Sequence, residues 1–151
     1  MAKPDAARGP AAGSPLAAAL DRIGDRWSPR IVEALLAAPL RYGELHIEVA
    51  GIAPNILADR LRRLEASGLL VATAYADRPP RFEYRLTAEG RALAGALRLL
   101  ADWGARHAGG GAADGTSLRH DACGSVLEAR WFCPTCGDVV DRTGPDETRR
   151  L

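Results

Sequence analysis

Four side chains that commonly bind metal ions lie close together near the C-terminus. They form two matching pairs, His120-x-x-Cys123 and Cys133-x-x-Cys136, and a glycine follows each pair. This spacing lets both members of a pair bind one ion, and the glycine permits the tight turn that directs backbone amides toward sulfur. Three thiolates and one imidazole fill the four positions of tetrahedral zinc, which is typical of structural sites. The sequence therefore predicts a structural Zn²⁺ bound by these four residues.

The alternative explanations for the thiols are a redox pair of Cys133 and Cys136 or a few unconnected cysteines. A C-x-x-C sequence can form a thioredoxin-like couple, but no βαβ pattern surrounds Cys133 and Cys136. The first residues lack the apolar stretch of a secretory leader, and no apolar run is long enough to span a membrane. We therefore expect a cytoplasmic, reducing environment, where clustered cysteines favour a metal. Val139 and Val140 could pair with residues 126–132, so that the segment resembles a rubredoxin-like zinc ribbon.

A second group of side chains suits DNA. On a helix that begins at Pro54, Leu57, Leu61 and Leu64 face a core, and Asn55 begins the opposite face. Asparagine can pair with adenine, arginine with guanine, and a small alanine can touch a thymine methyl. Arginines further along the helix, and those beside a hairpin turn, are suited to phosphates or the minor groove. The predicted DNA-contacting residues are Arg41, Pro54, Asn55, Ala58, Asp59, Arg60, Arg62, Arg63, Arg78 and Arg81.

Charge alone does not support DNA binding. The chain has a net charge of only +1, and residues 41–85 hold seven arginines against six acidic residues. A charged helix face is often merely solvated. Asp59 in particular would repel phosphate unless it accepts a hydrogen bond from cytosine or pairs with an arginine. The DNA-binding hypothesis depends instead on the order of the predicted elements.

These elements are mostly helical. Helices are predicted from Pro15 to near Gly24, from an N-cap at Ser28 to residue 38, over residues 41–49, and from Pro54 to a C′ glycine at Gly68. Strands at 70–75 and 81–86 flank a proline-rich turn, and Thr87 caps one long final helix. The fold class is mainly α with a small β-wing (α+β): a winged helix-turn-helix domain at 15–108 and a zinc-ribbon-like module at 118–141. We expect disordered tails at 1–14 and 142–151 and a flexible linker at 109–117.

Residues 16 to about 103 resemble the HxlR-type winged helix-turn-helix transcriptional regulators, distant relatives of the MarR group. The resemblance implies a homodimer in which the first and last helices pack between subunits, and each subunit places one recognition helix in a half-site of a double-stranded operator. Small-molecule effectors are possible, but no residue specifies one. The matching stretches are Ile23-Gly24-Asp25-Arg26-Trp27, Arg41-Tyr42-Gly43-Glu44-Leu45, Gly51-Ile52-Ala53-Pro54, the run from Leu57 to Leu64, Gly68-Leu69-Leu70 and the run from Tyr84 to Gly90.

The chain departs from this family at two positions. Family members usually carry a cysteine before the proline that opens the first helix, and some sense oxidants through it. Here Ser14 precedes Pro15, so that route of thiol sensing is closed. Ala53 stands where the family usually has a serine N-cap, which removes a side-chain cap of about 1 kcal/mol.

The sequence holds no phosphate loop, dinucleotide fingerprint or nucleophile set beside a His–acid pair, so we expect no enzyme. Two hypotheses remain. In the first, the protein is a DNA-binding regulator and the zinc module is accessory. In the second, the zinc module is a metal- or redox-responsive switch or a protein-docking adaptor.

Overall fold

The structure, a computed structural model, describes residues 13–107 and 119–140. The chain divides into two compact units, Met1–Leu97 and Arg98–Leu151, and each is described by itself. The predicted linker at 109–117, the tail at 142–151 and most of the tail at 1–14 lie outside the described residues. In the part of the chain that is described, no helix is long and apolar enough to cross a membrane.

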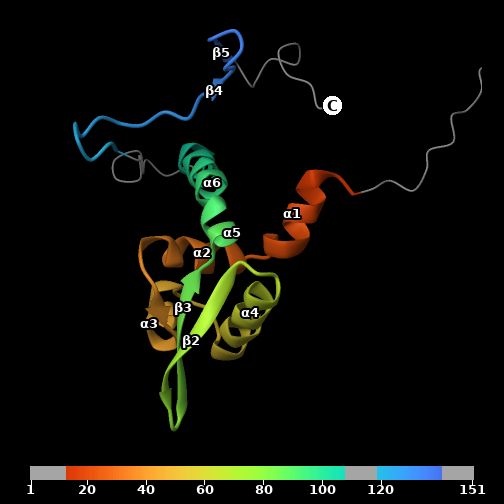
Figure 1. Cartoon of the computed structure of the whole chain (residues 1–151), viewed down its shortest axis with the longest axis vertical. Helices are drawn as coiled ribbons and strands as arrows, with labels where there is room; N and C mark the ends of the chain where they lie inside the picture. Colours follow the sequence, from red (N-terminus) through yellow and green to blue (C-terminus); the bar gives the residue numbers. More distant parts are fainter. Residues whose placement is uncertain (1–12, 108–118, 141–151) are drawn as a thin grey trace, which may run out of the picture. The chain divides into compact units, whose positions relative to one another are not determined.

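Four helices build the first part of the winged unit: α1 (Pro15–Ile23), α2 (Ser28–Ala37), α3 (Tyr42–Glu48) and α4 (Pro54–Ala66) (Figure 1). Proline lies in the first turn of α1, α2 and α4, where a missing N–H leaves no hydrogen bond unmade. Gly68 follows the C-cap of α4 at φ +75°, as predicted for a C′ glycine.

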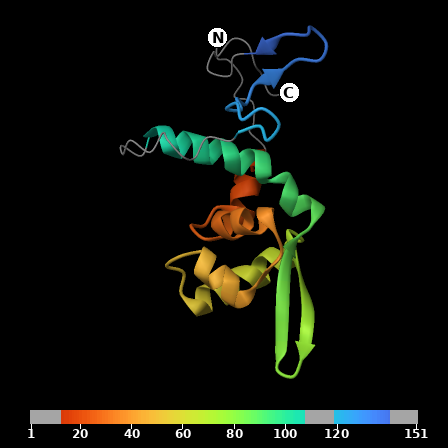
Figure 2. The same ribbon diagram turned by 90° about the vertical axis from the view of Figure 1, so that its left-hand side faces the viewer.

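A three-stranded antiparallel sheet contains the wing, which is its β2–β3 hairpin. Its strands are β1 (Leu40–Arg41), β2 (Leu70–Asp77) and β3 (Pro80–Leu86), in the order β1-β3-β2. The β2–β3 hairpin protrudes beyond the neighbouring helices α3 and α4 (Figure 2). Both strands are longer than predicted because pairing continues to Asp77 and Pro80, which leaves a two-residue turn. The sequence did not predict β1, since two residues after a proline show no alternation.

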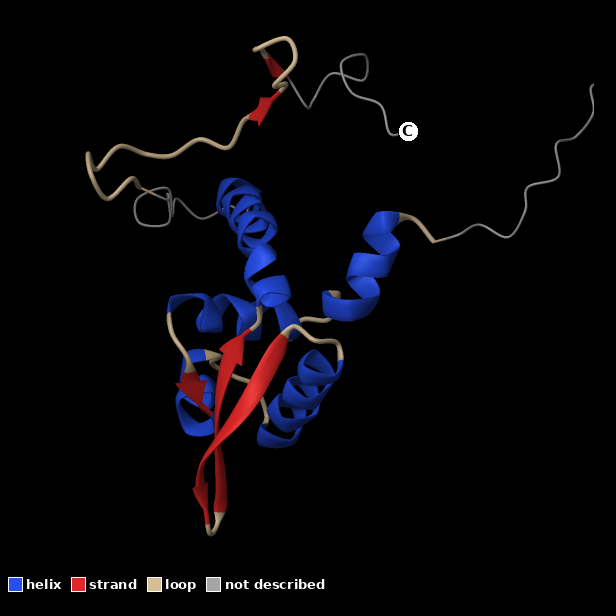
Figure 3. Ribbon diagram, in the orientation of Figure 1, coloured by secondary structure: helices blue, strands red, loops and turns tan. Residues whose placement is uncertain are grey.

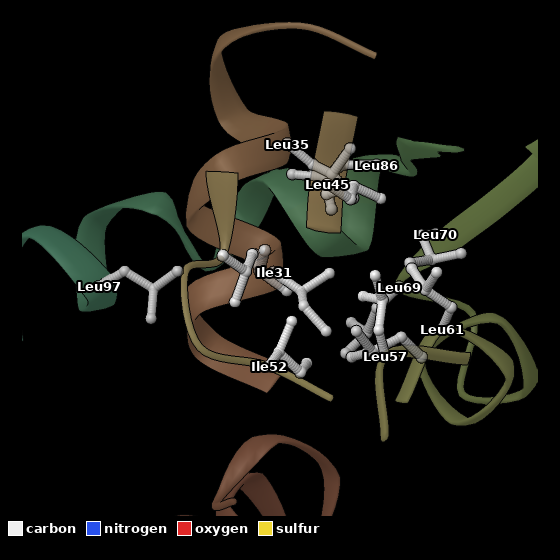
Figure 4. Packing of buried hydrophobic residues seen from close by; sticks show 13 residues of the cluster. Ile31, Leu35, Leu45, Ile52, Leu57, Leu61, Leu69, Leu70, Leu86 and Leu97 are labelled. Carbon is white, nitrogen blue, oxygen red and sulfur yellow. The ribbon is translucent and has the colours of Figure 1, made fainter. Parts of the chain in front are cut away.

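A single apolar cluster joins the helices to the sheet. The strand β2 packs against α4, and β1 and β3 pack against α3 (Figure 3). Leu57, Leu61 and Leu64 of α4 are fully buried, as their helical spacing predicted. Leu57 and Leu61 lie beside Leu69 and Leu70 in the core (Figure 4). This packing determines which face of α4 remains outside.

Two predicted helix boundaries were wrong. Ser28 is the first residue of α2 and Trp27 is the N-cap, because the Ser28 hydroxyl donates to Asp25 instead of capping the helix. Thr87 does cap a helix, but α5 (Ala88–Ala92) ends at Ala92 with Leu93 as its C-cap, and α6 (Ala94–His107) follows. The N–H of Leu93 bonds the Gly90 carbonyl at 3.2 Å, a tight i−3 bond that interrupts the helical ladder.

The second unit contains a small hairpin in its C-terminal segment. Its strands are β4 (Trp131–Phe132) and β5 (Val139–Val140), which pair antiparallel. An isolated antiparallel bridge joins Arg119 to Val126. The valines at 139 and 140 therefore pair with the end of the 126–132 segment, as expected.

Candidate nucleic-acid interface and metal-ligand pairs

The start of α4 is an accessible part of the predicted reading face. Pro54 and Asn55 are exposed, while Ala58 one turn later is half-buried. Arg62 and Arg63 are exposed further along the helix. No side chain caps the N-terminus at Ala53, so the first backbone N–H groups of α4 are not satisfied by a cap.

Tyr42 connects the two helices of the helix-turn-helix. Its hydroxyl donates a 2.7 Å hydrogen bond to the Pro54 carbonyl, and so links the start of α3 to the start of α4. In the sequence, Tyr42 stood out only as part of a stretch that matches the family. The bond spans twelve residues and depends on the angle between the helices, which periodicity does not report.

An ion-pair network holds the middle of α4. The Asp59 carboxylate pairs with Arg60 and Arg63 at 3.0 Å each, so its charge is compensated by arginines on its own helix. Arg60 also donates from Nε to Asp25 at 3.1 Å, and its side chain is only 20% exposed. Arg60 thus ties α4 to the segment before α2, and its predicted phosphate contact stays a prediction.

Asp25 accepts several hydrogen bonds at the same place. Its carboxylate accepts from the backbone N–H groups of Trp27 (2.8 Å) and Ser28 (3.0 Å), and from the Ser28 hydroxyl. Burial raises the pKa of Asp25, but the Ser28 hydroxyl, these backbone bonds and the Arg60 charge outweigh it. The net pKa is therefore lower than that of an ordinary aspartate.

The β2–β3 hairpin carries two further arginines. Arg78 and Arg81 are exposed at the hairpin turn. Arg41 of β1 stacks on the wing, with its guanidinium carbon 4.4 Å from the centre of the Tyr75 ring. Sequence reasoning missed Tyr75 because a single aromatic residue in a strand is usually a packing residue.

Two open grooves border these residues. One, of about 690 Å³, lies between α3 and the wing and is lined by Arg41, Tyr75, Arg81 and Phe82 among others. The other, of about 360 Å³, lies between α4 and the sheet, and Arg62 lines it. The structure therefore brings Arg41 and Arg81 to one groove and Arg62 to the other, whereas Arg60 turns away into its ion pairs.

The predicted metal ligands form two separate pairs. His120 Nδ1 lies 3.3 Å from Cys123 Sγ, and Cys133 Sγ lies 3.2 Å from Cys136 Sγ. None of the three cysteines, all of which are described, forms a disulfide. Within the described residues, no group of three or more His, Cys, Asp or Glu side chains is close enough to hold one ion. The four predicted ligands are thus brought together as pairs only.

Hydrogen bonds favour the thiolate form of Cys123 and Cys133, whereas the Cys133 side chain and its charge raise the pKa of the Cys136 thiol. The Ser125 side chain and backbone, followed by His120, lower the pKa of the Cys123 thiol. The backbone N–H of Cys136, its side chain and the backbone of Thr135 lower the pKa of the Cys133 thiol. A thiolate is the form of cysteine that binds metals.

A family model described as HxlR-like helix-turn-helix matches residues 22–110. Rv3095 of Mycobacterium tuberculosis, described as an uncharacterized HTH-type transcriptional regulator, is 34% identical over 128 residues, which cover 85% of this chain and 80% of that protein. The crystal structure of PA1607, described as a proposed transcription factor, has a TM-score of 0.75 and 32% identity, and covers 93% of this chain and 97% of its own.

A redox regulator is also similar. HypR in its reduced form has a TM-score of 0.58 and 31% identity, with 63% of this chain and 96% of that chain covered. The family match, residues 22–110, covers the helices α2 to α6 and the β2–β3 hairpin. The chain belongs to the HxlR-like family of helix-turn-helix proteins, which are DNA-binding transcriptional regulators and not enzymes.

Proposed function

We propose that the protein is a homodimeric, sequence-specific regulator. Each subunit places α4 in the major groove of one operator half-site and the β2–β3 wing on the minor groove or the backbone. The observation that carries the proposal is the exposed start of α4 at Pro54 and Asn55, opposite the buried stripe of leucines. Arg78 and Arg81 at the protruding hairpin provide the second contact.

The dimer is supported by apolar side chains on the first and last helices. Leu16 and Leu20 of α1 are 59% and 54% exposed, and Leu100 and Trp103 of α6 are 61% and 58% exposed. Large apolar side chains exposed at helical spacing favour burial against another chain. In this proposal, residues 119–140 form an accessory module that binds a structural zinc ion.

Sequence readout is tested with operators selected from random DNA by the full chain. Asn55→Ala is expected to relax base preference at the contacted position by about 1–3 kcal/mol, because it removes a base-edge contact. Arg78→Ala is the matched control. It is expected to weaken binding to all sequences alike and to reduce the salt slope by about 1, since it removes a phosphate contact. An unchanged preference in Asn55→Ala would contradict the assigned reading face.

A second candidate function is a metal- or redox-responsive switch or a docking adaptor. The exposed Cys136 thiol, 3.2 Å from Cys133 Sγ, favours it, and HypR is a redox regulator. Operator binding with and without a chelator separates the candidates. Binding that survives complete metal removal supports the accessory module. Loss of binding, with the winged unit still folded by circular dichroism, supports the switch.

A further inference from the structure

Residues 119–140 have a defined backbone without a hydrophobic core. Every described side chain in this segment is exposed except Cys133 and Val140, which are half-buried. Val126, Phe132 and Val139 are 51%, 61% and 54% exposed. Apolar burial of this extent is too small to stabilise a segment of this length. Another interaction must therefore supply the stability.

The two ligand pairs lie in turns with the same backbone hydrogen bonds. In each turn, the first ligand residue donates its N–H to the carbonyl five residues later: His120 to Ser125 and Cys133 to Asp138, both at 2.9 Å. The glycine four residues later donates back to the carbonyl of the first ligand residue, at 2.7 Å in one turn and 2.9 Å in the other. One arrangement is thus built twice, each time with ligands at its first and fourth positions.

The glycines make both turns possible. Gly124 has φ +70° and Gly137 has φ +78°, and L side chains rarely adopt this conformation. Each glycine follows the second ligand of its pair directly, where the chain must turn back. In both turns, the glycine that the sequence places after the second ligand therefore has the backbone conformation that the turn requires.

Within each pair, the two ligand atoms already have nearly the separation that zinc requires. Tetrahedral Zn²⁺ with bonds of about 2.3 Å to sulfur and about 2.0 Å to nitrogen holds neighbouring ligand atoms about 3.5–3.8 Å apart. The pairs are 3.3 Å and 3.2 Å apart. Each pair needs to open by only about 0.6 Å or less to fit.

We propose that one Zn²⁺ joins the two turns of a single chain. Its ligands are His120 Nδ1 and the Sγ atoms of Cys123, Cys133 and Cys136. This inference rests on the accessory zinc module proposed above and assigns its ligand atoms. The three thiols lose their protons to solvent as the Zn–S bonds form, and the imidazole binds in its neutral form. One turn lies beside the Arg119–Val126 bridge and the other in the β4–β5 hairpin, so the metal would join them.

The test is zinc content of the full chain, purified under reducing conditions without chelator. Elemental analysis is expected to find about one zinc ion per chain. Cys123→Ser and Cys136→Ser remove one ligand from each turn, and both are expected to lose most of the zinc. Asp121→Ala lies between two ligands without being one, and is expected to keep it. His120→Ala is expected to lose zinc, whereas His120→Cys restores a four-ligand site and retains it.

Cobalt substitution provides a second readout. The full chain loaded with Co²⁺ is expected to show the absorption of tetrahedral cobalt with a sulfur-to-metal charge-transfer band, which weakens in each Cys→Ser variant. Absence of zinc together with three reactive thiols would overturn the inference. Zinc content unchanged in Cys123→Ser or His120→Ala would overturn the four-ligand set. One ion per two chains would overturn closure within one chain.

Operator binding of the same samples separates the two proposals. Variants that lose zinc and still bind operator support an accessory zinc site. A zinc-loaded chain that binds no operator contradicts the proposed DNA reading, while the zinc inference stands.

Discussion

At the scale of single residues, a few polar side chains determine how α4 is held. Asp25 accepts backbone hydrogen bonds at the start of α2 and forms an ion pair with Arg60 of α4. Arg60 is therefore a positioning residue in this structure, whereas Arg62 and Arg63 have their surfaces exposed. A basic helix face thus contains both structural and accessible arginines.

Asp25→Asn is expected to lower the free energy of unfolding by about 1–2 kcal/mol at neutral pH, because charge-assisted hydrogen bonds become neutral ones. The folded-state pKa of Asp25 is depressed, so its contribution is complete above the unfolded pKa of 3.8 and is lost as pH falls through the folded pKa. The difference between wild type and variant should therefore narrow in acid. Urea unfolding of both proteins at acidic and neutral pH measures this difference in the free energy of unfolding.

Asp21→Asn is the control, since Asp21 is an exposed aspartate on α1. It is expected to leave stability nearly unchanged. If wild type and Asp25→Asn differ in free energy of unfolding by the same amount at every pH, the charge of Asp25 is not involved.

At the scale of elements, α5 is fitted closely to the sheet. Thr87 Oγ1 accepts the Gly90 N–H at 3.1 Å and donates to the Gly68 carbonyl at 2.7 Å. A Cβ on Gly90 would lie 2.1 Å from the Leu69 carbonyl oxygen and 3.1 Å from a Leu86 methyl group. The backbones of α5 and of Leu69, just before β2, therefore approach each other only because Gly90 has no side chain.

Gly90→Ala is expected to destabilise the winged unit by about 1–3 kcal/mol, because backbone must shift to remove the clash. Thermal and urea unfolding followed by circular dichroism measure this loss. Gly95→Ala is the matched control in α6, where an added Cβ would meet nothing within 4 Å. Gly95→Ala is expected to raise the free energy of unfolding by about 0.5–1 kcal/mol, because alanine has a higher helix propensity than glycine. Equal effects of the two substitutions would rule out the close approach at Gly90.

At the scale of the whole molecule, the described chain has exposed apolar side chains on α1 and α6 that its own winged core does not use. Their exposure supports the proposed dimer. Ile47 of α3 is 77% exposed and belongs to neither helix. It therefore provides a control for the effect of placing a charge at an exposed apolar position.

Leu20→Asp and Leu100→Asp are each expected to convert the dimer into monomers, because a carboxylate would be buried without a partner. Sedimentation equilibrium gives the mass. Affinity for a full palindromic operator should fall by about a hundredfold or more as the two half-sites lose their linkage. Ile47→Asp should leave the mass unchanged. A wild-type chain that sediments as a monomer would contradict the proposed dimer.

The sequence by itself determined the local elements. Prolines in first turns, the glycine at position 68 and the periodic leucines of α4 predicted where helices begin, end and face, because each acts within a few residues. The wing turn and the two ligand pairs were visible for the same reason. Matching stretches in the correct order also predicted the family.

Only the tertiary structure decided which predicted contacts are available. The Arg60–Asp25 pair, the Tyr42 bond to Pro54 and the stacking of Arg41 on Tyr75 join residues 12 to 35 positions apart. Such contacts depend on how helices and strands pack, which periodicity along the chain does not encode. The strand β1 likewise follows from pairing with the distant strand β3. The sequence therefore determined the elements and the candidate residues, and packing decided which side chains remain outside to bind.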